Sequence, residues 1–185
     1  MEDSILIGKI LDGDLRSFKI LVEQNERLVF HVVGKLIGEP REEIEDLCQE
    51  VFLLVFKQLP KFKEQSKLST WIAKIAFNTT INHLKKKKIK LTHSELENID
   101  FQTPESLIIL NDQKEFLRTQ INQLPKQYGL VITLFHLNEM SYPEIVEITN
   151  WPIGTVKNYL YRARKLLKEK LVKHSNLNLR IHEEN

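Results

Sequence analysis

A segment in the C-terminal quarter of the chain carries side chains that could bind DNA. Lysine, asparagine, tyrosine and arginine recur there at steps of one and three residues, which places them on one face of a predicted helix. The face comprises Gly154, Lys157, Asn158, Tyr161, Arg162 and Lys165. Asparagine can bridge a base edge, and arginine or lysine can bond guanine or phosphate, so this face suits a DNA major groove. The alternative interpretation is a basic helix that only faces solvent.

The elements that would position this face have helix-turn-helix spacing. An apolar set on the same segment steps by four, three and four residues, which predicts a buried side. This set is Val156, Leu160, Ala163 and Leu167. Another helical segment, residues 142–149, lies upstream, and Asn150 and Trp151 form the turn between the two. A helix-turn-helix alone is compatible with many kinds of DNA-binding regulator.

The sequence has no arrangement typical of an enzyme or a metal site. The phosphate-binding patterns G-x-x-x-x-G-K-[ST] and G-x-G-x-x-G are absent, as is H-E-x-x-H. The histidines are scattered, without a carboxylate at ligand spacing, so each is expected to be a core or surface residue. Cys48 is the single cysteine and is expected to be a buried structural thiol. We predict no catalytic residue, no metal ligand and no cofactor.

Charge is arranged in zones, although the net charge is only +2. Residues 1–60 carry 7 basic and 12 acidic groups, whereas residues 61–90 carry 9 basic and 1 acidic group. The chain is acidic again over residues 91–124 and basic over residues 125–185. Two basic zones suggest contact with a polyanion at two places. No run approaches the ~18 apolar residues of a membrane span, and the acidic start is unlike a signal peptide. We expect a cytoplasmic protein with no membrane insertion.

Low glycine and proline content predicts an all-α fold, since the chain has only 6 of each. Periodicity and helix-end residues predict helices over 4–11, 14–38, 40–60, 70–88, 103–124, 125–138, 142–149 and 152–173. Residues 89–103 lose the periodicity and have the composition of a linker. We therefore predict two small helical domains, residues 1–88 and 104–174, joined by a flexible linker at 89–103 and followed by a tail at 175–185.

Several short motifs resemble the ECF (extracytoplasmic function) sigma factors of bacterial RNA polymerase. In the N-terminal half they are D-L-C-Q-E-V-F at 46–52 and S-T-W-I-A-K-I-A-F-N at 69–78. In the C-terminal half they are L-P at 124–125, S-Y-P-E-I at 141–145, P-I-G-T-V-K at 152–157 and R-A-R at 162–164. The motifs follow the order and spacing of the family and span about residues 3–172. The resemblance implies a transcription initiation factor and not an enzyme.

The resemblance implies a contact with core RNA polymerase and a contact with the minus-35 promoter element. In the family, the second long helix binds a coiled coil of the largest polymerase subunit. Its outer stripe is acidic here with one leucine, which suits a basic helical partner. The stripe is Asp46, Gln49, Glu50, Leu53 and Lys57. The residues expected at the minus-35 element in duplex DNA are Thr155, Lys157, Asn158, Tyr161, Arg162 and Lys165.

The basic zone at residues 61–90 corresponds in the family to the surface that melts the promoter at the minus-10 element. A base flipped from the non-template strand would be held between the loop before Trp71 and the amide of Asn78, while lysines hold the backbone. The residues expected here are Phe62, Lys63, Ser66, Lys74, Asn78, Lys85 and Lys86. Trp71 itself is expected in the core. Many members carry Arg-Gly after the loop phenylalanine, whereas this chain has Lys63-Glu64, which bears on the shape and base preference of the loop.

The partners implied are core RNA polymerase, promoter DNA as duplex and melted single strand, and an anti-sigma factor that contacts both domains. The acidic segment at residues 91–101 would thread through the polymerase toward the RNA exit path. One alternative is a helix-turn-helix regulator that binds duplex DNA without polymerase, but it leaves the motifs at 46–78 unexplained. The other is a helical protein-binding adaptor, which would have no salt-dependent affinity for DNA.

Overall fold

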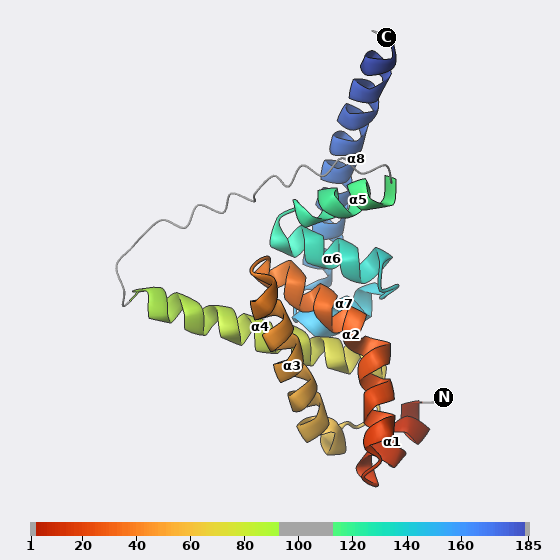
Figure 1. Ribbon diagram of the computed structural model, residues 1–185, viewed down its shortest axis with the longest axis vertical. Coiled ribbons are helices and arrows are strands. Elements are labelled where there is room, and N and C mark those ends of the chain that lie inside the picture. Colours follow the sequence, from red (N-terminus) through yellow and green to blue (C-terminus); the bar gives the residue numbers. More distant parts are fainter. Residues whose placement is uncertain (1–2, 93–112, 184–185) are drawn as a thin grey trace.

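A computed structural model of the chain describes residues 3–92 and 113–183, with side chains described for residues 3–89 and 116–172. All regular secondary structure in the described residues is helical, as the sequence predicts, and these residues form no strand (Figure 1). The helices are α1 (Asp3–Leu11), α2 (Leu15–Ile37), α3 (Arg41–Gln58), α4 (Leu68–Thr92), α5 (Gln113–Asn122), α6 (Lys126–His136), α7 (Tyr142–Thr149) and α8 (Ile153–Glu183). A single 3-10 turn, Leu59–Lys61, follows α3.

The N-terminal helices α1 to α4 pack around α2. The side chain of Asp14 caps α2 by accepting hydrogen bonds from the Arg16 backbone N–H at 3.0 Å and the Ser17 hydroxyl at 2.8 Å. Gly38 ends this helix with φ +91°, which favours glycine. The apolar stripes of α2, α3 and α4 meet in a core without solvent access, which includes Leu21, Val29, Val32, Val33, Val51, Val55, Ile72 and Ala76.

The C-terminal helices α5 to α8 form the second group, which contains the predicted helix-turn-helix. Ser141 and Glu144 form a capping box at the start of α7, since each side chain bonds the backbone N–H of the other residue. Asn150 ends α7 in the left-handed conformation, φ +56°, and directs the chain into α8. The core of this group includes Leu130, Leu134, Ile145, Ile148, Val156, Leu160 and Ala163, all at most 1% exposed. The predicted buried side of α8 is confirmed.

The two groups of helices also pack on each other, which the sequence prediction of two linked domains did not include. Helix α6 lies against α2, and α7 lies against α4, so segments more than 70 residues apart in the chain are neighbours (Figure 1). The distal part of α8 projects away from this body (Figure 1).

Helices α4 and α8 extend further than the sequence predicts. Helix α4 begins at Leu68 and continues to Thr92, so the first four residues assigned to the linker, 89–92, are helical. Helix α8 continues to Glu183, so most of the expected tail at 175–185 is helical as well. Both extensions lack proline and glycine, and nothing in their sequence stops a helix that has already formed. The rest of the linker and the start of the helix predicted at 103–124 lie outside the described residues.

Candidate polymerase and nucleic-acid interfaces

The predicted polymerase-binding stripe is an exposed face of α3. Its buried side, which contains Ile44, Leu47, Val51 and Val55, packs against α2 and α4. All five stripe residues are exposed, namely Asp46, Gln49, Glu50, Leu53 and Lys57. Leu53 is 61% exposed, and Phe56, which the sequence analysis did not select, is 42% exposed beside it. The rings of Phe56 and Phe18 meet edge to face at 4.9 Å. Phe56 could have been found from the sequence, because a step of three residues places it on the same face of the helix as Leu53.

The loop before α4 is anchored by an aromatic pair. The rings of Phe62 and Trp71 lie 5.0 Å apart, and both residues are half-buried. The expectation that Trp71 packs inside is thus met only in part. Lys63 is exposed and Ser66 is half-buried. Glu64 has a left-handed φ of +54°, so the loop adopts a conformation that favours glycine at the position where many family members carry one.

The remaining minus-10 candidates lie along α4. Lys74 is half-buried, whereas Asn78, Lys85 and Lys86 are exposed. Ten residues separate Asn78 from the start of the helix at Leu68, a rise of about 15 Å. The structure therefore spreads this set along the helix, and Asn78 lies nearly three turns from the helix start that follows the loop.

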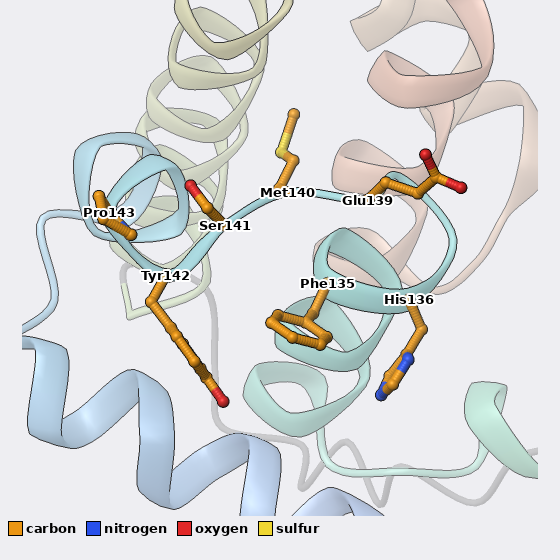
Figure 2. A pocket seen from close by; sticks show the side chains of 7 residues that line it. All are labelled: Phe135, His136, Glu139, Met140, Ser141, Tyr142 and Pro143. Carbon is orange, nitrogen blue, oxygen red and sulfur yellow. The ribbon is translucent and has the colours of Figure 1, made fainter.

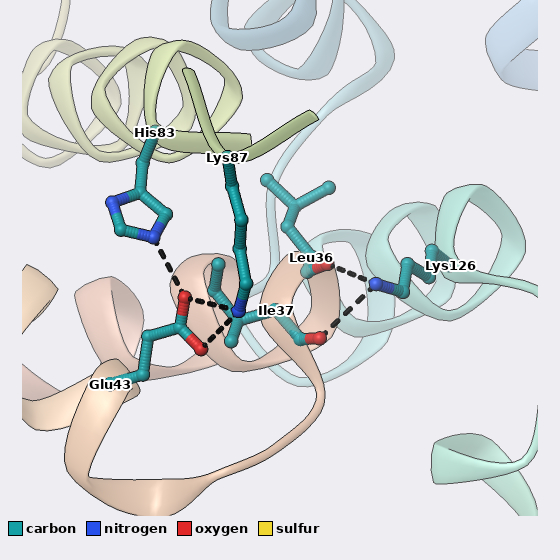
Figure 3. Close-up of polar contacts among 6 residues, drawn as sticks. All are labelled: Leu36, Ile37, Glu43, His83, Lys87 and Lys126. Carbon is teal, nitrogen blue, oxygen red and sulfur yellow. Dashed lines mark hydrogen bonds and ion pairs between the residues drawn. The ribbon is translucent and has the colours of Figure 1, made fainter. Parts of the chain in front are cut away.

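A carboxylate ties one lysine of the run 85–88 to α3. Glu43 accepts hydrogen bonds from Lys87 Nζ at 2.9 and 3.0 Å and contacts His83 Nε2 at 2.7 Å (Figure 3). Partial burial opposes ionisation of Glu43, but these hydrogen bonds lower its pKa overall. Lys87 is thus paired with a carboxylate of the protein, whereas Lys85 and Lys86 are exposed.

The predicted minus-35 face of α8 points away from its core. Thr155 is half-buried, and the other five residues are exposed, namely Lys157, Asn158, Tyr161, Arg162 and Lys165. Two tyrosines outside the predicted set contact this face: Lys157 Nζ lies 5.9 Å from the centre of the Tyr142 ring, and Arg162 Nη1 donates to the Tyr128 hydroxyl at 3.2 Å. Sequence alone could not find Tyr128, because it lies 34 residues before its partner.

Two hollows lie on the C-terminal domain. One, of about 550 Å³, lies between the end of α6 and the start of α7 (Figure 2). His136 lines this hollow and accepts from Arg164 at Nε2 at 3.2 Å, and burial together with Arg164 lowers the pKa of His136. The other, of about 430 Å³, is an apolar groove between α5, α6 and α8 whose lining includes Leu117, Ile121, Leu137, Leu167 and Leu171. Neither contains a group arranged for catalysis.

Within residues 3–89 and 116–172, no group of three histidine, cysteine or carboxylate side chains could hold a metal ion. Cys48 is half-buried, so the expectation of a buried thiol is met only in part, and burial raises the pKa of this thiol to about 11. Among the described helices, none combines the length and apolar character needed to cross a membrane.

Comparison with known proteins places this geometry in a family. The sequence profile for Sigma-70 region 2 matches residues 21–89, which include α3 and most of α4. The profile for Sigma-70, region 4 matches residues 115–167, which include the helix-turn-helix. The chain therefore belongs to the sigma-70 family of transcription initiation factors.

Its relatives narrow the type of sigma factor. The chain is 27% identical over 183 residues to the ECF RNA polymerase sigma-E factor of Escherichia coli K12, covering 92% of this chain and 95% of the relative. The sigma-E factor of Haemophilus influenzae is equally similar, with 92% and 96% covered. With both family regions present in order, the chain is an ECF-type sigma factor.

Solved structures show the same fold. The sigma factor RpoE of Bartonella quintana, in complex with the anti-sigma factor NepR, superposes with a TM-score of 0.65 at 23% identity, covering 84% of this chain and 97% of the other. CnrH, in complex with the cytosolic domain of CnrY, superposes with a TM-score of 0.63 at 19% identity, covering 92% and 97%.

Proposed function

We propose that this sigma factor binds core RNA polymerase through α3, holds the melted minus-10 element on α4 and its preceding loop, and reads the minus-35 element with α8. The observation that carries the proposal is the exposure of an acidic face on α3 and a basic face on α8, each within a segment that matches a family region. The protein acts by binding and has no catalytic step of its own. Its place of action is the cytoplasm, where polymerase and promoters are found.

The polymerase contact is supported by the chemistry of α3. Asp46 and Glu50 lie one turn apart beside the exposed Leu53. A basic helical partner could pair with the carboxylates and cover the leucine, which combines electrostatic steering with apolar burial. Phe56 extends the apolar part of this contact.

The minus-10 contact is supported by the pairing of a stacking residue with nearby cations. The Phe62 ring lies against Trp71, which positions the loop, while Lys63 and Lys74 can neutralise phosphates of a single strand. Asn78 can donate to and accept from one base edge. An unpaired base is accessible to such contacts because it has left the duplex stack.

The minus-35 contact is supported by the way α8 presents its residues. Asn158 and Arg162 share an exposed face, and a duplex major groove admits one helix. Lys157 and Lys165 can contact phosphates on either side, which fixes the register of the helix on DNA.

An anti-sigma factor is the third proposed partner. Of the two proteins with the same fold, the sigma factor RpoE was solved in complex with the anti-sigma factor NepR, and CnrH was solved in complex with the cytosolic domain of CnrY. The identity of such a partner for this chain would be found by co-purification.

In vitro transcription on genomic fragments tests the proposal. Core polymerase with this protein should initiate at specific start sites, and core polymerase alone should not. A helix-turn-helix regulator that acts without polymerase would bind duplex DNA yet leave the transcripts unchanged, and it would fail to co-purify with core enzyme. A protein-binding adaptor would show no salt-dependent DNA affinity. Either result would overturn the proposed function.

A further inference from the structure

Gly154, the second residue of α8, occupies a position where the fold does not require a glycine. Its backbone is not among those with positive φ in the described residues, so the usual reason for a glycine, a left-handed conformation, does not apply. A Cβ atom added to Gly154 would meet no atom within 4 Å. In a helix, glycine is less favourable than alanine, because glycine loses more conformational freedom on folding.

The contrast with two other helical glycines shows which property of Gly154 matters. At Gly129 of α6, an added Cβ would lie 3.3 Å from the carbonyl oxygen of Ile121, so close packing accounts for that glycine. Gly8 of α1 has open space around it, as Gly154 has. Open space alone therefore assigns no role, and the argument for Gly154 depends on where this residue lies.

Gly154 lies on the face of α8 that the proposed function assigns to the minus-35 element. Steps of three, four and seven residues lead from it to Lys157, Asn158 and Tyr161. All three of these residues are exposed, and so is Gly154. The N-terminal residues of a recognition helix are those that contact base edges in the major groove. Gly154 is therefore at the end of the face that comes closest to the bases.

The bare backbone at Gly154 forms a small recess in this face, which we call the Gly154 recess. The ammonium group of Lys157 lies 5.9 Å from the centre of the Tyr142 ring, so this cation is directed toward α7. Ile153, which precedes the recess in the chain, is 49% exposed and adds apolar surface at the start of the helix. Such surroundings suit an apolar group. On the major-groove edges of the four bases, that group is the 5-methyl of thymine.

We propose that the Gly154 recess receives the 5-methyl group of a thymine in the minus-35 element, so that Gly154 determines specificity at one base pair. The assignment rests on the proposed role of α8. Asn158, one turn further along the helix, can bond N6 and N7 of an adenine. The face then reads an adenine edge through an amide and a thymine methyl through close approach of the backbone. A side chain at position 154 would occupy the space that the methyl group takes.

Gly154→Ala fills the recess with one methyl group. Because the fold leaves room for this Cβ and alanine favours a helix, Tm should rise by about 1–4 °C. Gly8→Ala is the matched control, since Gly8 is also an exposed helical glycine with open space around it. The control should raise Tm to a similar extent and leave α8 unchanged. A loss of DNA affinity in a variant that is more stable cannot come from unfolding.

Deoxyuridine in place of thymine removes the 5-methyl group and leaves the rest of the major-groove edge intact. Holoenzymes that contain the wild type or either variant are titrated against a promoter duplex identified by in vitro transcription. Each thymine of the minus-35 element, on either strand, is replaced in turn. At one position, the replacement should lower the affinity of the wild-type holoenzyme about fourfold, the effect of losing one buried methyl group.

The two variants should then differ on the same duplexes. Gly154→Ala should bind the unmodified duplex roughly tenfold more weakly than the wild type. Deoxyuridine at the sensitive position should restore most of this loss, because the methyl group of alanine takes the place of the missing one. Gly8→Ala should match the wild type on every duplex. Rescue by deoxyuridine is the result that a purely structural role of Gly154 would not produce.

Three results would overturn the proposal. If the wild type is insensitive to every deoxyuridine, then no thymine methyl is bound in the minus-35 element. If Gly154→Ala binds as the wild type does, then no base approaches Gly154. If it binds all duplexes equally weakly and without rescue, then the DNA backbone, and not a methyl group, approaches this residue. Lys157→Ala with Arg162→Ala is titrated in parallel, and full affinity of that variant would identify a failure of the proposed function itself.

Discussion

The acidic face of α3 and the basic face of α8 differ in how their side chains are held. Lys157 and Arg162 on α8 contact the rings or hydroxyls of tyrosines on neighbouring helices. The α3 residues project from an exposed helical surface beside Leu53. Base recognition depends on hydrogen-bond geometry and gains from side chains held in place, whereas a steering contact with a basic partner depends mainly on charge. Mutations should therefore act on the α3 face through charge and on the α8 face through position.

The largest effect is expected from charge reversal on α3. Asp46→Arg with Glu50→Arg should abolish holoenzyme formation, because like charges at an interface cost several kcal/mol. Both residues are exposed, so the fold and the affinity of the free protein for DNA should remain nearly unchanged. Co-purification with core enzyme provides the measurement. Normal yield of the mutant holoenzyme would place the polymerase contact elsewhere.

Removal of two cations from α8 should weaken minus-35 recognition. Lys157→Ala with Arg162→Ala leaves the buried side of the helix intact, since both residues are exposed opposite Val156 and Leu160. Loss of one bidentate base contact costs about 1–3 kcal/mol. Promoter selectivity should fall in transcription assays while core binding is retained. Unchanged selectivity would refute the role assigned to this face.

The corresponding test on the minus-10 surface is Asn78→Ala, which removes both a donor and an acceptor. The loss, about 1–3 kcal/mol, should fall on open-complex formation, because the base must be unstacked before it can be bound. Permanganate footprinting should show reduced opening on a native promoter at unchanged minus-35 occupancy. A pre-melted promoter should restore part of the opening. Equal opening by mutant and wild type would make Asn78 a surface residue without a role in recognition.

A smaller effect should separate position from charge on α8. Tyr128→Phe keeps the ring but removes the hydroxyl that accepts from Arg162 Nη1 at 3.2 Å. Minus-35 affinity should fall modestly, and the same change in an Arg162→Ala background should have no further effect. Fluorescence anisotropy on a promoter duplex measures all four proteins of the cycle. Additive effects would show that Tyr128 does not act through Arg162.

The sequence predicts which residues lie on the exposed face of a helix, because helical periodicity is a local pattern. It does not predict contacts between residues far apart in the chain. The exposed face of α8 and the exposed stripe of α3 follow from the apolar side of each helix, which is a local pattern. The ion pair of Lys67 with Glu144 joins positions 77 residues apart, and no local pattern encodes it. The lengths of α4 and α8 were underestimated because a loss of apolar periodicity suggested linker or tail, whereas neither segment contains a proline or glycine that would end the helix.

The backbone of the minus-10 loop provides the last and smallest test. Glu64 has φ +54°, a conformation that costs an L-residue about 1–2 kcal/mol and costs glycine little. Part of this gain is lost because glycine also makes the unfolded chain more flexible. Glu64→Gly should therefore raise the free energy of unfolding by about 0.5–1 kcal/mol, seen as a small rise in Tm.

The neighbouring Gln65→Gly is the matched control for that loop, because Gln65 is exposed and is not among the residues with positive φ in the described chain. It carries the entropic cost of glycine without relieving strain, so its Tm should fall. If the two substitutions shift Tm in the same direction, then Glu64 is not strained. If Glu64→Gly stabilises the fold and opening at the minus-10 element is unchanged, then the loop keeps the shape that glycine gives in other family members, and glutamate at this position affects stability and not base recognition.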